Sequence, residues 1–308
     1  MDGRETDSSG DAVLDRRLDW ARAYARDGDS VAAEGLLADL VEIAPHFLAA
    51  WFLLGQVRED LGRPDAAGAY ERVLAGDPAD RLGAGLRLAR LGARPAQGAM
   101  STAFVRTLFD QYADRFERAL REDLSYRGPE ILAGAVKADC ARLGRAPAFE
   151  RALDLGCGTG LAAPLFAPWC ATLEGVDLAP AMVERARRSG LYDELHVGEM
   201  VAFLARQDMG RADLVLAVDA FCYLADLSDV LRAARRALRV GALVAFTVET
   251  HDGDGVMLRD TLRYAHGSEY VVRALAQAGF ETRQLETLST RTERQIPVPG
   301  LVAVARAV

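Results

Sequence analysis

The sequence predicts an α/β protein, in which a mostly parallel sheet with helices on both faces follows a segment made only of helices. Helical repeats fill residues 1–95, and from Arg151 onward short apolar runs alternate with amphipathic runs. Strands that alternate with helices predict a parallel sheet, because each parallel connection has to cross the sheet. A further observation, three glycines directly after the apolar run Arg151–Leu155, indicates where a ligand binds.

The composition favours about two domains and disfavours some classes of partner. The 308 residues include 37 basic and 45 acidic ones, a net charge of −8, which disfavours nucleic acid and anionic membranes. The cysteines show no CxxC spacing, so we expect reduced thiols in the cytosol. The first residues lack a basic and an apolar region, and no run of about 20 apolar residues follows. We therefore expect no signal peptide, no membrane span and a cytoplasmic location.

The N-terminal residues repeat with a period near that of helical-hairpin arrays. Ala33, Leu37, Leu40 and Pro45 recur 33 residues later as Ala66, Tyr70, Val73 and Pro78. Small residues let two antiparallel helices approach closely, larger ones fill the layer between units, and the proline ends the second helix. A generic bundle of helical hairpins is the alternative interpretation of the same residues.

This pattern resembles the tetratricopeptide repeat. The motifs that carry the resemblance are "WFLLG" (Trp51–Gly55), Gly62 and "AYERVLAGDP" (Ala69–Pro78), while the first copy, with Ala21 and Tyr24, is looser. The resemblance implies a tetratricopeptide-like domain over residues 1–95. Such a domain would hold a protein partner, associate with another copy, or pack within the chain.

Residues 96–150 are expected to form a helical linker and a lid over the cofactor site. "GARPAQGAMS" (92–101) has the glycines and proline of a linker. The apolar residues of 102–120 then fall three to four positions apart, as on one helix face. "YRGPEIL" (126–132) places Gly-Pro before another helix, which is a helix-start signal.

Residues 151–308 are expected to form strands separated by helices. The parallel strands are expected at Arg151–Leu155, Thr172–Asp177, Glu194–Gly198, Ala212–Val218 and Ala242–Glu249. Two later runs, "ETRQLETLSTRT" (281–292) and "GLVAVARA" (300–307), are joined by a short link with Pro297 and Pro299. A short link favours an antiparallel hairpin at one edge of the sheet.

The glycines of "LDLGCGTG" allow a tight turn at the carboxyl end of the first strand. Gly156, Gly158 and Gly160 can adopt positive φ and leave room for a ligand against the main chain. Ligands of open α/β sheets bind at such strand ends. The loop alone fits several kinds of nucleotide.

Side chains near the loop narrow the choice. Asp177 ends the second strand, where a carboxylate can accept both hydroxyls of a ribose, and Leu178 offers an apolar surface to adenine. Glu199 could accept from an exocyclic amine, and Met200 could give a main-chain contact to the ring. Asp154 would favour a cationic amino group and disfavour a pyrophosphate.

These motifs resemble class I S-adenosylmethionine-dependent methyltransferases. "LDLGCGTG" is similar to their first motif and "GVDLAPAMVERAR" (175–187) to their second. "GEMVAFL" and "ADLVLAVDAFCYL" match their adenine loop and fourth strand, so the resemblance covers about residues 104–308. It implies a Rossmann-like seven-stranded methyltransferase sheet, mostly parallel with an antiparallel last strand.

The whole chain also looks like a bacterial family of predicted methyltransferases with N-terminal tetratricopeptide repeats. "LFDQYADRFERAL" (108–120), "LSYRGPEIL" (124–132) and "RYAHGSEYVVRALAQAGF" (263–280) carry this match. The resemblance implies S-adenosylmethionine as cofactor and S-adenosylhomocysteine as product. The implied cofactor-binding residues are Tyr112, Arg127, Asp154, Gly156, Cys157, Gly158, Gly160, Asp177, Leu178, Met182, Glu199, Met200 and Asp219.

Methyl transfer needs an acceptor aligned with the sulfonium and shielded from water. A hydroxyl or amine acceptor also gains from a general base. The candidate catalytic residues follow the fourth and fifth strands. They are Asp219, Tyr223, His251, Tyr264 and His266, and Glu249, which ends the fifth strand, is a further candidate. The histidines are too scattered in sequence to predict a metal site.

The acceptor is expected to be a small molecule or a protein side chain, at oxygen or nitrogen. Relatives of this fold that methylate DNA bases carry Asn/Asp-Pro-Pro-aromatic after the fourth strand, where this chain reads "VDAFCYL". Two alternatives stay open. One is a tetratricopeptide interaction module with a silent methyltransferase-like domain, and the other is a nicotinamide oxidoreductase, for which the GxGxxG spacing is incomplete.

Overall fold

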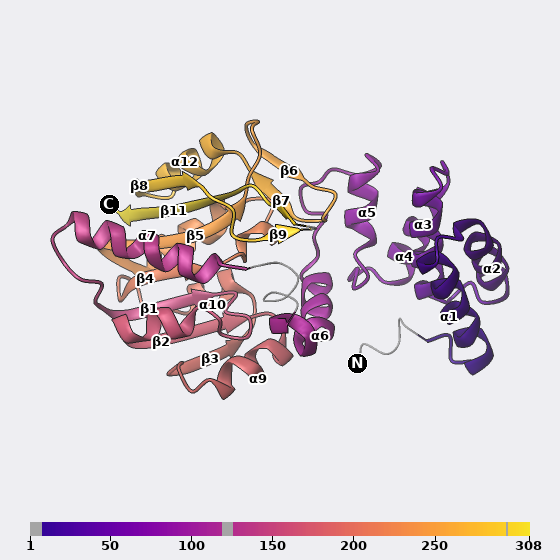
Figure 1. Cartoon of the computed structure of the whole chain (residues 1–308), viewed down its shortest axis with the longest axis horizontal. Coiled ribbons are helices and arrows are strands. Elements are labelled where there is room, and N and C mark those ends of the chain that lie inside the picture. Colours follow the sequence, from indigo (N-terminus) through magenta and orange to yellow (C-terminus); the bar gives the residue numbers. More distant parts are fainter. Residues whose placement is uncertain (1–7, 119–125, 294) are drawn as a thin grey trace. The chain divides into compact units, whose positions relative to one another are not determined.

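A computed structural model describes residues 8–118, 126–293 and 295–308. The chain divides into two compact units, Met1–Thr107 and Leu108–Val308. Figure 1 shows helices in the first unit and a sheet with helices in the second. Leu120 and the first residues of "LSYRGPEIL", on which two sequence interpretations partly depended, lie outside the described residues.

The first unit contains a series of helices in which each packs on the one before it. Their bounds are α1 Ala12–Arg26, α2 Ser30–Ile43, α3 Leu48–Asp60, α4 Ala66–Gly76 and α5 Ala84–Arg90. Asp11 and Asp29 begin α1 and α2, because their carboxylates accept the free backbone N–H groups of Val13 and Ala32. The helical nature predicted for this segment is therefore confirmed.

The predicted small-to-large packing occurs between α3 and α4. A Cβ atom on Gly55 would lie 2.6 Å from the ring of Tyr70, so only glycine lets these helices approach as they do. Tyr70 is fully buried, as are Ala33 and Leu37 on α2. The repeated residues within α2 and α4 therefore form the interior of the helical unit, while Pro45 and Pro78 after these helices are exposed.

The second unit is built on one twisted sheet. The main strands are β1 Phe149–Leu155, β2 Cys170–Asp177, β3 Glu194–Val197, β4 Ala212–Ala217, β5 Leu238–Glu249, β8 Phe280–Thr287 and β11 Gly300–Ala307. They lie in the order β3-β2-β1-β4-β5-β11-β8, and β11 runs antiparallel to both of its neighbours. The mostly parallel sheet with its antiparallel last strand is confirmed.

The described sheet has nine strands, where the sequence predicted seven. The additional strands, β6 Val256–Leu258 and β7 Tyr264–His266, form a hairpin in the insertion after β5. The connection from β8 to β11 also differs from the prediction. It contains a small hairpin of β9 Thr292–Glu293 and β10 Ile296–Pro297, and β8 already ends at Thr287.

Helices cover both faces of the sheet. One apolar core lies between the sheet and α7 Gly128–Arg142 and α8 Ala163–Phe166, and the other lies under α10 Met200–Ala205, α11 Ser228–Ala237 and α12 Ser268–Gln277. Leu153 and Leu155 of β1 face the second core, so Asp154 projects from the opposite face. Among the described residues, no helix is long and apolar enough to cross a membrane.

Candidate cofactor and acceptor site

The glycine loop follows β1 and has the backbone that its sequence predicts. Gly156, Gly158 and Gly160 have φ of 68°, 55° and 88°. The space beside two of them, however, is filled by protein. A Cβ on Gly156 would lie 2.5 Å from Cβ of Ala220, and one on Gly160 would lie 3.1 Å from the ring of Tyr192. These glycines therefore make room for neighbouring residues, whereas the sequence interpretation assigned that room to a ligand.

Asp177 ends β2 and faces the glycine loop. Its carboxylate accepts the backbone N–H of Gly158 and that of Ala179, each at 2.9 Å. Burial raises the pKa of Asp177, and the two N–H donors act in the opposite direction. Each carboxylate oxygen has a second lone pair, so Asp177 can still accept from two further hydroxyls.

Asp154 lies beneath the loop and is almost inaccessible, with 2% exposed. Its Oδ2 accepts the hydroxyl proton of Tyr192 at 2.7 Å. Burial raises the pKa of Asp154 to about 7, while the Tyr192 hydrogen bond lowers it and the nearby Asp177 carboxylate raises it. Asp154 therefore changes its charge near neutral pH.

A small cavity of about 50 Å³ adjoins Asp154 and the glycine loop. Its lining includes the predicted residues Asp154, Gly156, Cys157 and Gly158, together with Tyr126, Pro129, Thr159, Leu161, Ala162 and Val218. The hydroxyl of Thr159 is buried and has no hydrogen-bond partner among the described residues. Ligand pockets usually have at least ~300 Å³. A nucleoside-sized ligand therefore requires the wall of this cavity to move.

Tyr126, which the sequence interpretation did not include, forms part of that wall. Its ring lies against Gly128, where a Cβ would come within 2.6 Å of the hydroxyl. Burial raises the pKa of Tyr126 well above its usual value. The predicted Arg127 is exposed and does not line the cavity, and its backbone N–H donates to the carbonyl of Thr290 at 2.8 Å.

α6 (Thr102–Arg118) contacts the first turn of α9 (Pro180–Arg188), next to the end of β2. Asp110 accepts the backbone N–H of Ala181 at 3.0 Å and so caps α9. The predicted Met182 is fully buried in an apolar cluster with Ala113 and is not a cavity-lining residue. Tyr112 is half-buried on the same α6.

The predicted adenine-binding residues begin α10. Both carboxylate oxygens of Glu199 accept backbone N–H groups, from Val201 at 2.9 Å and Ala202 at 2.8 Å. Glu199 is therefore the N-cap of α10 and keeps one lone pair on each oxygen. Met200 and Leu178 are both partly exposed, which leaves their surfaces accessible.

Asp219 follows β4 and is held in a network of side chains. Its backbone has φ of 51°, a conformation that is strained for a residue other than glycine. The carboxylate accepts from Thr247 at 2.7 Å and from Thr290 at 3.1 Å, and it lies 3.5 Å from the guanidinium of Arg291. These contacts fix the position of the Asp219 carboxylate.

Glu249, at the end of β5, belongs to the same network. It is 3% exposed and pairs with Arg291, which is itself 4% exposed. Arg263 and Arg259 approach Glu249 at 3.6 and 3.8 Å. Arg263 also donates to the hydroxyl of Tyr223 at 3.1 Å. Arg259, Arg263 and Arg291 come from outside the predicted strand ends, so the sequence interpretation missed them.

The other predicted catalytic residues do not converge. The ring of His266 is fully buried, donates from Nε2 to the carbonyl of Leu224 at 2.9 Å, and has a pKa that burial lowers to about 4. Tyr264 is 1% exposed. His251 accepts from Gly253 and bonds to the carbonyl of Gly255 within its own loop. An acceptor therefore cannot reach Tyr264 or His266 in this conformation.

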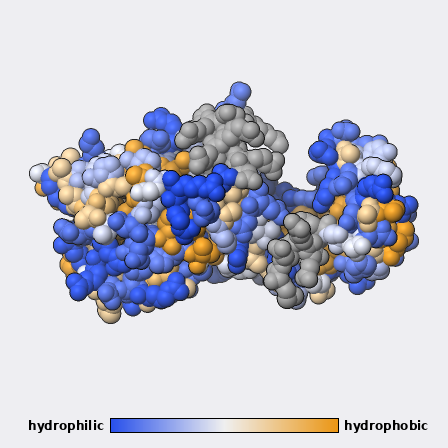
Figure 2. Space-filling view, turned by 90° about the horizontal axis from the view of Figure 1, so that it is seen from below, coloured by the Kyte–Doolittle hydropathy of each residue, from blue (hydrophilic) through white to orange (hydrophobic). Residues whose placement is uncertain are grey.

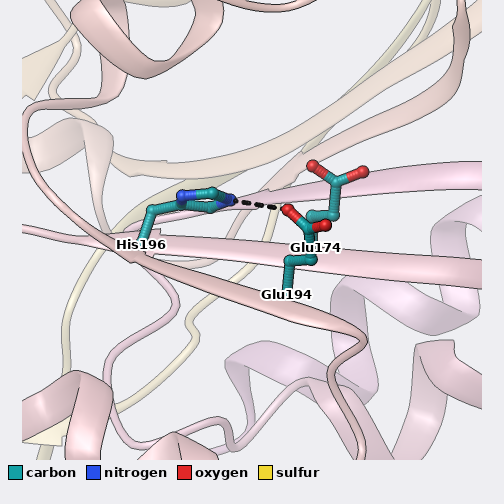
Figure 3. A group of neighbouring side chains, drawn as sticks. All are labelled: Glu174, Glu194 and His196. Atoms are coloured by element: carbon teal, nitrogen blue, oxygen red, sulfur yellow. Dashed lines mark ion pairs between the residues drawn. The ribbon is translucent and has the colours of Figure 1, made fainter.

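One group of side chains among the described residues has the spacing of a metal site, although the scattered histidines predicted none. Ligand atoms of Glu174 on β2 and of Glu194 and His196 on β3 lie within 4.8 Å of one another. Figure 3 shows the three side chains close together on neighbouring strands. Arg151 already bonds Glu174 at 2.6 Å. This guanidinium supplies the positive charge that a metal ion would otherwise bring.

A larger surface hollow of about 670 Å³ lies at the opposite end of the sheet, beside the first residues of β5. Met209, Arg236 and Val240 are among its lining residues. Ligands of parallel sheets bind at the carboxyl ends of the strands. The small cavity beside the glycine loop is therefore the better candidate site.

The sheet order, the glycine loop after β1 and an acid at the end of β2 define the class of S-adenosylmethionine-dependent methyltransferases. The family model described as a methyltransferase domain matches residues 153–246. Human methyltransferase-like protein 27 is 31% identical over 205 residues, which are 66% of this chain and 78% of that protein. The chain therefore belongs to the methyltransferase family, and its cofactor is S-adenosylmethionine.

Two further similarities are more limited. The ubiquinone biosynthesis O-methyltransferase of Xanthomonas oryzae pv. oryzae is 31% identical over 128 residues, which are 41% of this chain and 52% of that protein. The solved 1,6-didemethyltoxoflavin-N1-methyltransferase of Burkholderia thailandensis aligns with a TM-score of 0.52 and 18% identity, over 67% of this chain and 88% of that one. The first covers about half of its relative, and the second shows the fold alone.

Proposed function

We propose that the second unit transfers a methyl group from S-adenosylmethionine to an oxygen or nitrogen of a small molecule or a protein side chain. The observation that supports this most is the contact between Asp177 and Gly158, which places a carboxylate with free acceptor capacity beside the glycine loop. The chain's methyltransferase relatives argue against the alternative of a nicotinamide oxidoreductase.

The described residues fit the parts of the cofactor. Asp177 would hold the ribose hydroxyls, Glu199 and Met200 the adenine, and Leu178 one face of the ring. The amino-acid portion would lie against the loop, where Asp154 suits an ammonium group. The unpartnered hydroxyl of Thr159 suits a carboxylate. An orphaned buried hydroxyl costs free energy, so a ligand that satisfies it gains affinity.

The bound cofactor supplies an electrophilic methyl group, and the protein aligns the acceptor and excludes water. Tyr126 and the first residues of α7 border the cavity, and α6 caps α9 next to the end of β2. We assign them to a lid within residues 96–150, which moves to admit the cofactor. Tyr223 is the candidate for orienting the acceptor, since Arg263 fixes its hydroxyl.

Calorimetry with S-adenosylhomocysteine and with NAD tests this proposal and the silent-domain alternative together. We expect S-adenosylhomocysteine to bind and NAD not to bind. Asp177→Ala should weaken S-adenosylhomocysteine binding by at least ~1 kcal/mol, because a charge-assisted hydrogen-bond acceptor is lost.

Asp213→Ala is the matched control. Like Asp177, Asp213 accepts two backbone N–H groups, those of Glu150 at 2.8 Å and Arg151 at 3.0 Å, but at the start of β1, away from the glycine loop. We expect the affinity of Asp213→Ala for S-adenosylhomocysteine to equal that of the unmodified chain. Equal affinities in all three proteins would refute the assignment of Asp177, and no binding at all would favour the silent domain.

We further propose that α1 to α4 are tetratricopeptide-like repeats that hold a protein partner or a second copy of the chain, in a cytoplasmic protein. Figure 2 shows hydrophobic residues at the surface of the N-terminal unit, at the right of the view. On α1, Val13, Trp20 and Tyr24 fall on one face and are each about half exposed. Sedimentation of the full chain and of its Trp20→Ala variant would separate the two possibilities. An oligomer that Trp20→Ala dissociates would indicate self-association, and a monomer in both cases would favour a protein partner.

A further inference from the structure

Tyr192 lies in the connection between α9 and β3, outside every motif that the sequence interpretation used. The next residue, Asp193, fixes this connection to β2 through two hydrogen bonds with the backbone of Leu173, at 2.9 and 2.8 Å. The position of Tyr192 is therefore set by the sheet. Its hydroxyl reaches Asp154 at 2.7 Å.

Two glycines on different elements form a slot for the ring of Tyr192. A Cβ on Gly160 of the loop would lie 3.1 Å from the ring, and a Cβ on Gly175 of β2 would lie 2.9 Å from it. Any other residue at either position would displace the ring. The third glycine of the loop is thereby linked to Tyr192 and, through its hydroxyl, to Asp154.

The charge of Asp154 depends on few neighbours. The titratable groups that face it are Tyr192, Asp177 at the end of β2, Cys157 in the loop and Tyr126 before α7. Among the described residues, no arginine or lysine forms an ion pair with Asp154. Tyr192 is therefore the neighbour whose hydrogen bond stabilises the carboxylate, against both burial and the charge of Asp177.

We propose that Tyr192 is a positioning residue, which holds Asp154 as a carboxylate facing the glycine loop so that it recognises the ammonium group of the cofactor's methionine portion. This inference rests on the proposed binding of S-adenosylmethionine at the loop. A neutral Asp154 would leave the ammonium group without a counter-charge in a buried site. Binding of the amino-acid portion is then coupled to release of a proton from Asp154.

The test compares two ligands of the full chain by calorimetry between pH 6 and pH 8.5. S-adenosylhomocysteine carries the ammonium group, and 5′-methylthioadenosine has the same nucleoside without it. Since the pKa of Asp154 is about 7, we expect the affinity for S-adenosylhomocysteine to rise about tenfold from pH 6 to pH 8. The affinity for 5′-methylthioadenosine should change less than about twofold.

Tyr192→Phe keeps the ring in its slot and removes only the hydroxyl. Loss of the hydrogen bond raises the pKa of Asp154, so the rise in affinity moves to higher pH. We expect a loss of about fivefold for S-adenosylhomocysteine at pH 7 and recovery to within about twofold at pH 8.5, for a displacement of about one unit. Binding of 5′-methylthioadenosine should not change.

Tyr270→Phe is the matched control, because Tyr270 also donates to an aspartate, Asp226 at 3.0 Å, far from the loop in sequence. It should keep the pH profile of the unmodified chain. Identical profiles for the unmodified chain and Tyr192→Phe would overturn the inference and leave the proposed function intact. Equal weakening of both ligands at every pH would also overturn it, by showing a packing role. Failure of the unmodified chain to bind S-adenosylhomocysteine would instead refute the proposed function.

Discussion

Polar groups are satisfied differently at the two ends of the site. Where β2 and β3 end, the carboxylates of Asp177 and Glu199 accept backbone N–H groups that follow them closely in sequence or belong to the adjacent loop. Where β4 and β5 end, Asp219 and Glu249 instead pair with guanidinium groups from later segments. At the first end the carboxylates are satisfied by backbone N–H groups, and at the second end they are satisfied by side chains.

This difference explains which part of the site could be predicted. A glycine loop and an acid at a strand end determine their geometry locally, so the position of Asp177 beside the loop could be predicted from sequence. The contacts of Arg291 with Glu249 and Asp219 join residues 42 and 72 positions apart. Only the folded sheet and the β9–β10 hairpin bring these residues together.

Removing Arg291 should have the largest effect. Arg291→Met leaves the buried Glu249 without its main partner, and an unpaired buried charge costs about 3–5 kcal/mol. The control, Arg306→Met, breaks a pair with Glu281 in which the two side chains are 39% and 45% exposed. That change should cost less than ~1 kcal/mol.

Urea unfolding followed by hydrogen exchange of peptides from β4 and β5 would measure the free energy of unfolding of the second unit separately from the first. Similar costs for the two variants would contradict the comparison between the two ends. Such a result would mean that the network around Arg291 contributes no more to the free energy of unfolding than a surface ion pair does.

The fold itself was largely predictable. The alternation of strands and helices follows from local patterns of apolar residues, and the antiparallel β11 was predicted from the short link before it. The β6–β7 hairpin was missed because its strands are short and pair only with each other and with β5. Tyr192 was missed because its hydrogen bond to Asp154 spans 38 residues, and nothing in its local sequence marks it.

His266 and Asp154 should affect stability with opposite dependence on pH. The pKa of His266 falls to about 4 on folding, so between pH 6.5 and 4 the unfolded chain binds a proton that the folded chain does not. Its contribution to the free energy of unfolding is therefore lost as the pH falls through this window, by on the order of 3 kcal/mol. The pKa of Asp154 is raised to about 7, so its contribution falls as the pH rises from about 4 to 7.

We would compare the free energies of unfolding of the unmodified chain and of His266→Gln across pH 4 to 7. The comparison isolates the contribution of His266, since the Asp154 effect is common to both proteins. We expect the difference in unfolding free energy between the two proteins to shrink as the pH falls. A difference that stays constant would show that His266 has the same proton affinity in both states. Asp154→Asn should have the opposite dependence.

The smallest predicted effect concerns whether packing or the cofactor requires a glycine at position 156. Gly190→Ala introduces a Cβ into open space at φ of +66°, so it should cost only the backbone penalty of about 1 kcal/mol. Gly156→Ala has a similar φ of +68°, but its Cβ would meet Ala220 at 2.5 Å. Overpacking then adds at least ~1 kcal/mol, for a total of about 2 kcal/mol.

The double variant Gly156→Ala with Ala220→Gly separates packing from ligand space. If Gly156 serves packing, the second change should recover the added cost and restore the affinity for S-adenosylhomocysteine. If the affinity stays low after stability has recovered, the bare backbone at Gly156 faces the ligand, as the sequence alone indicated. Gly156 would then be required by the cofactor, and its contact with Ala220 would be secondary.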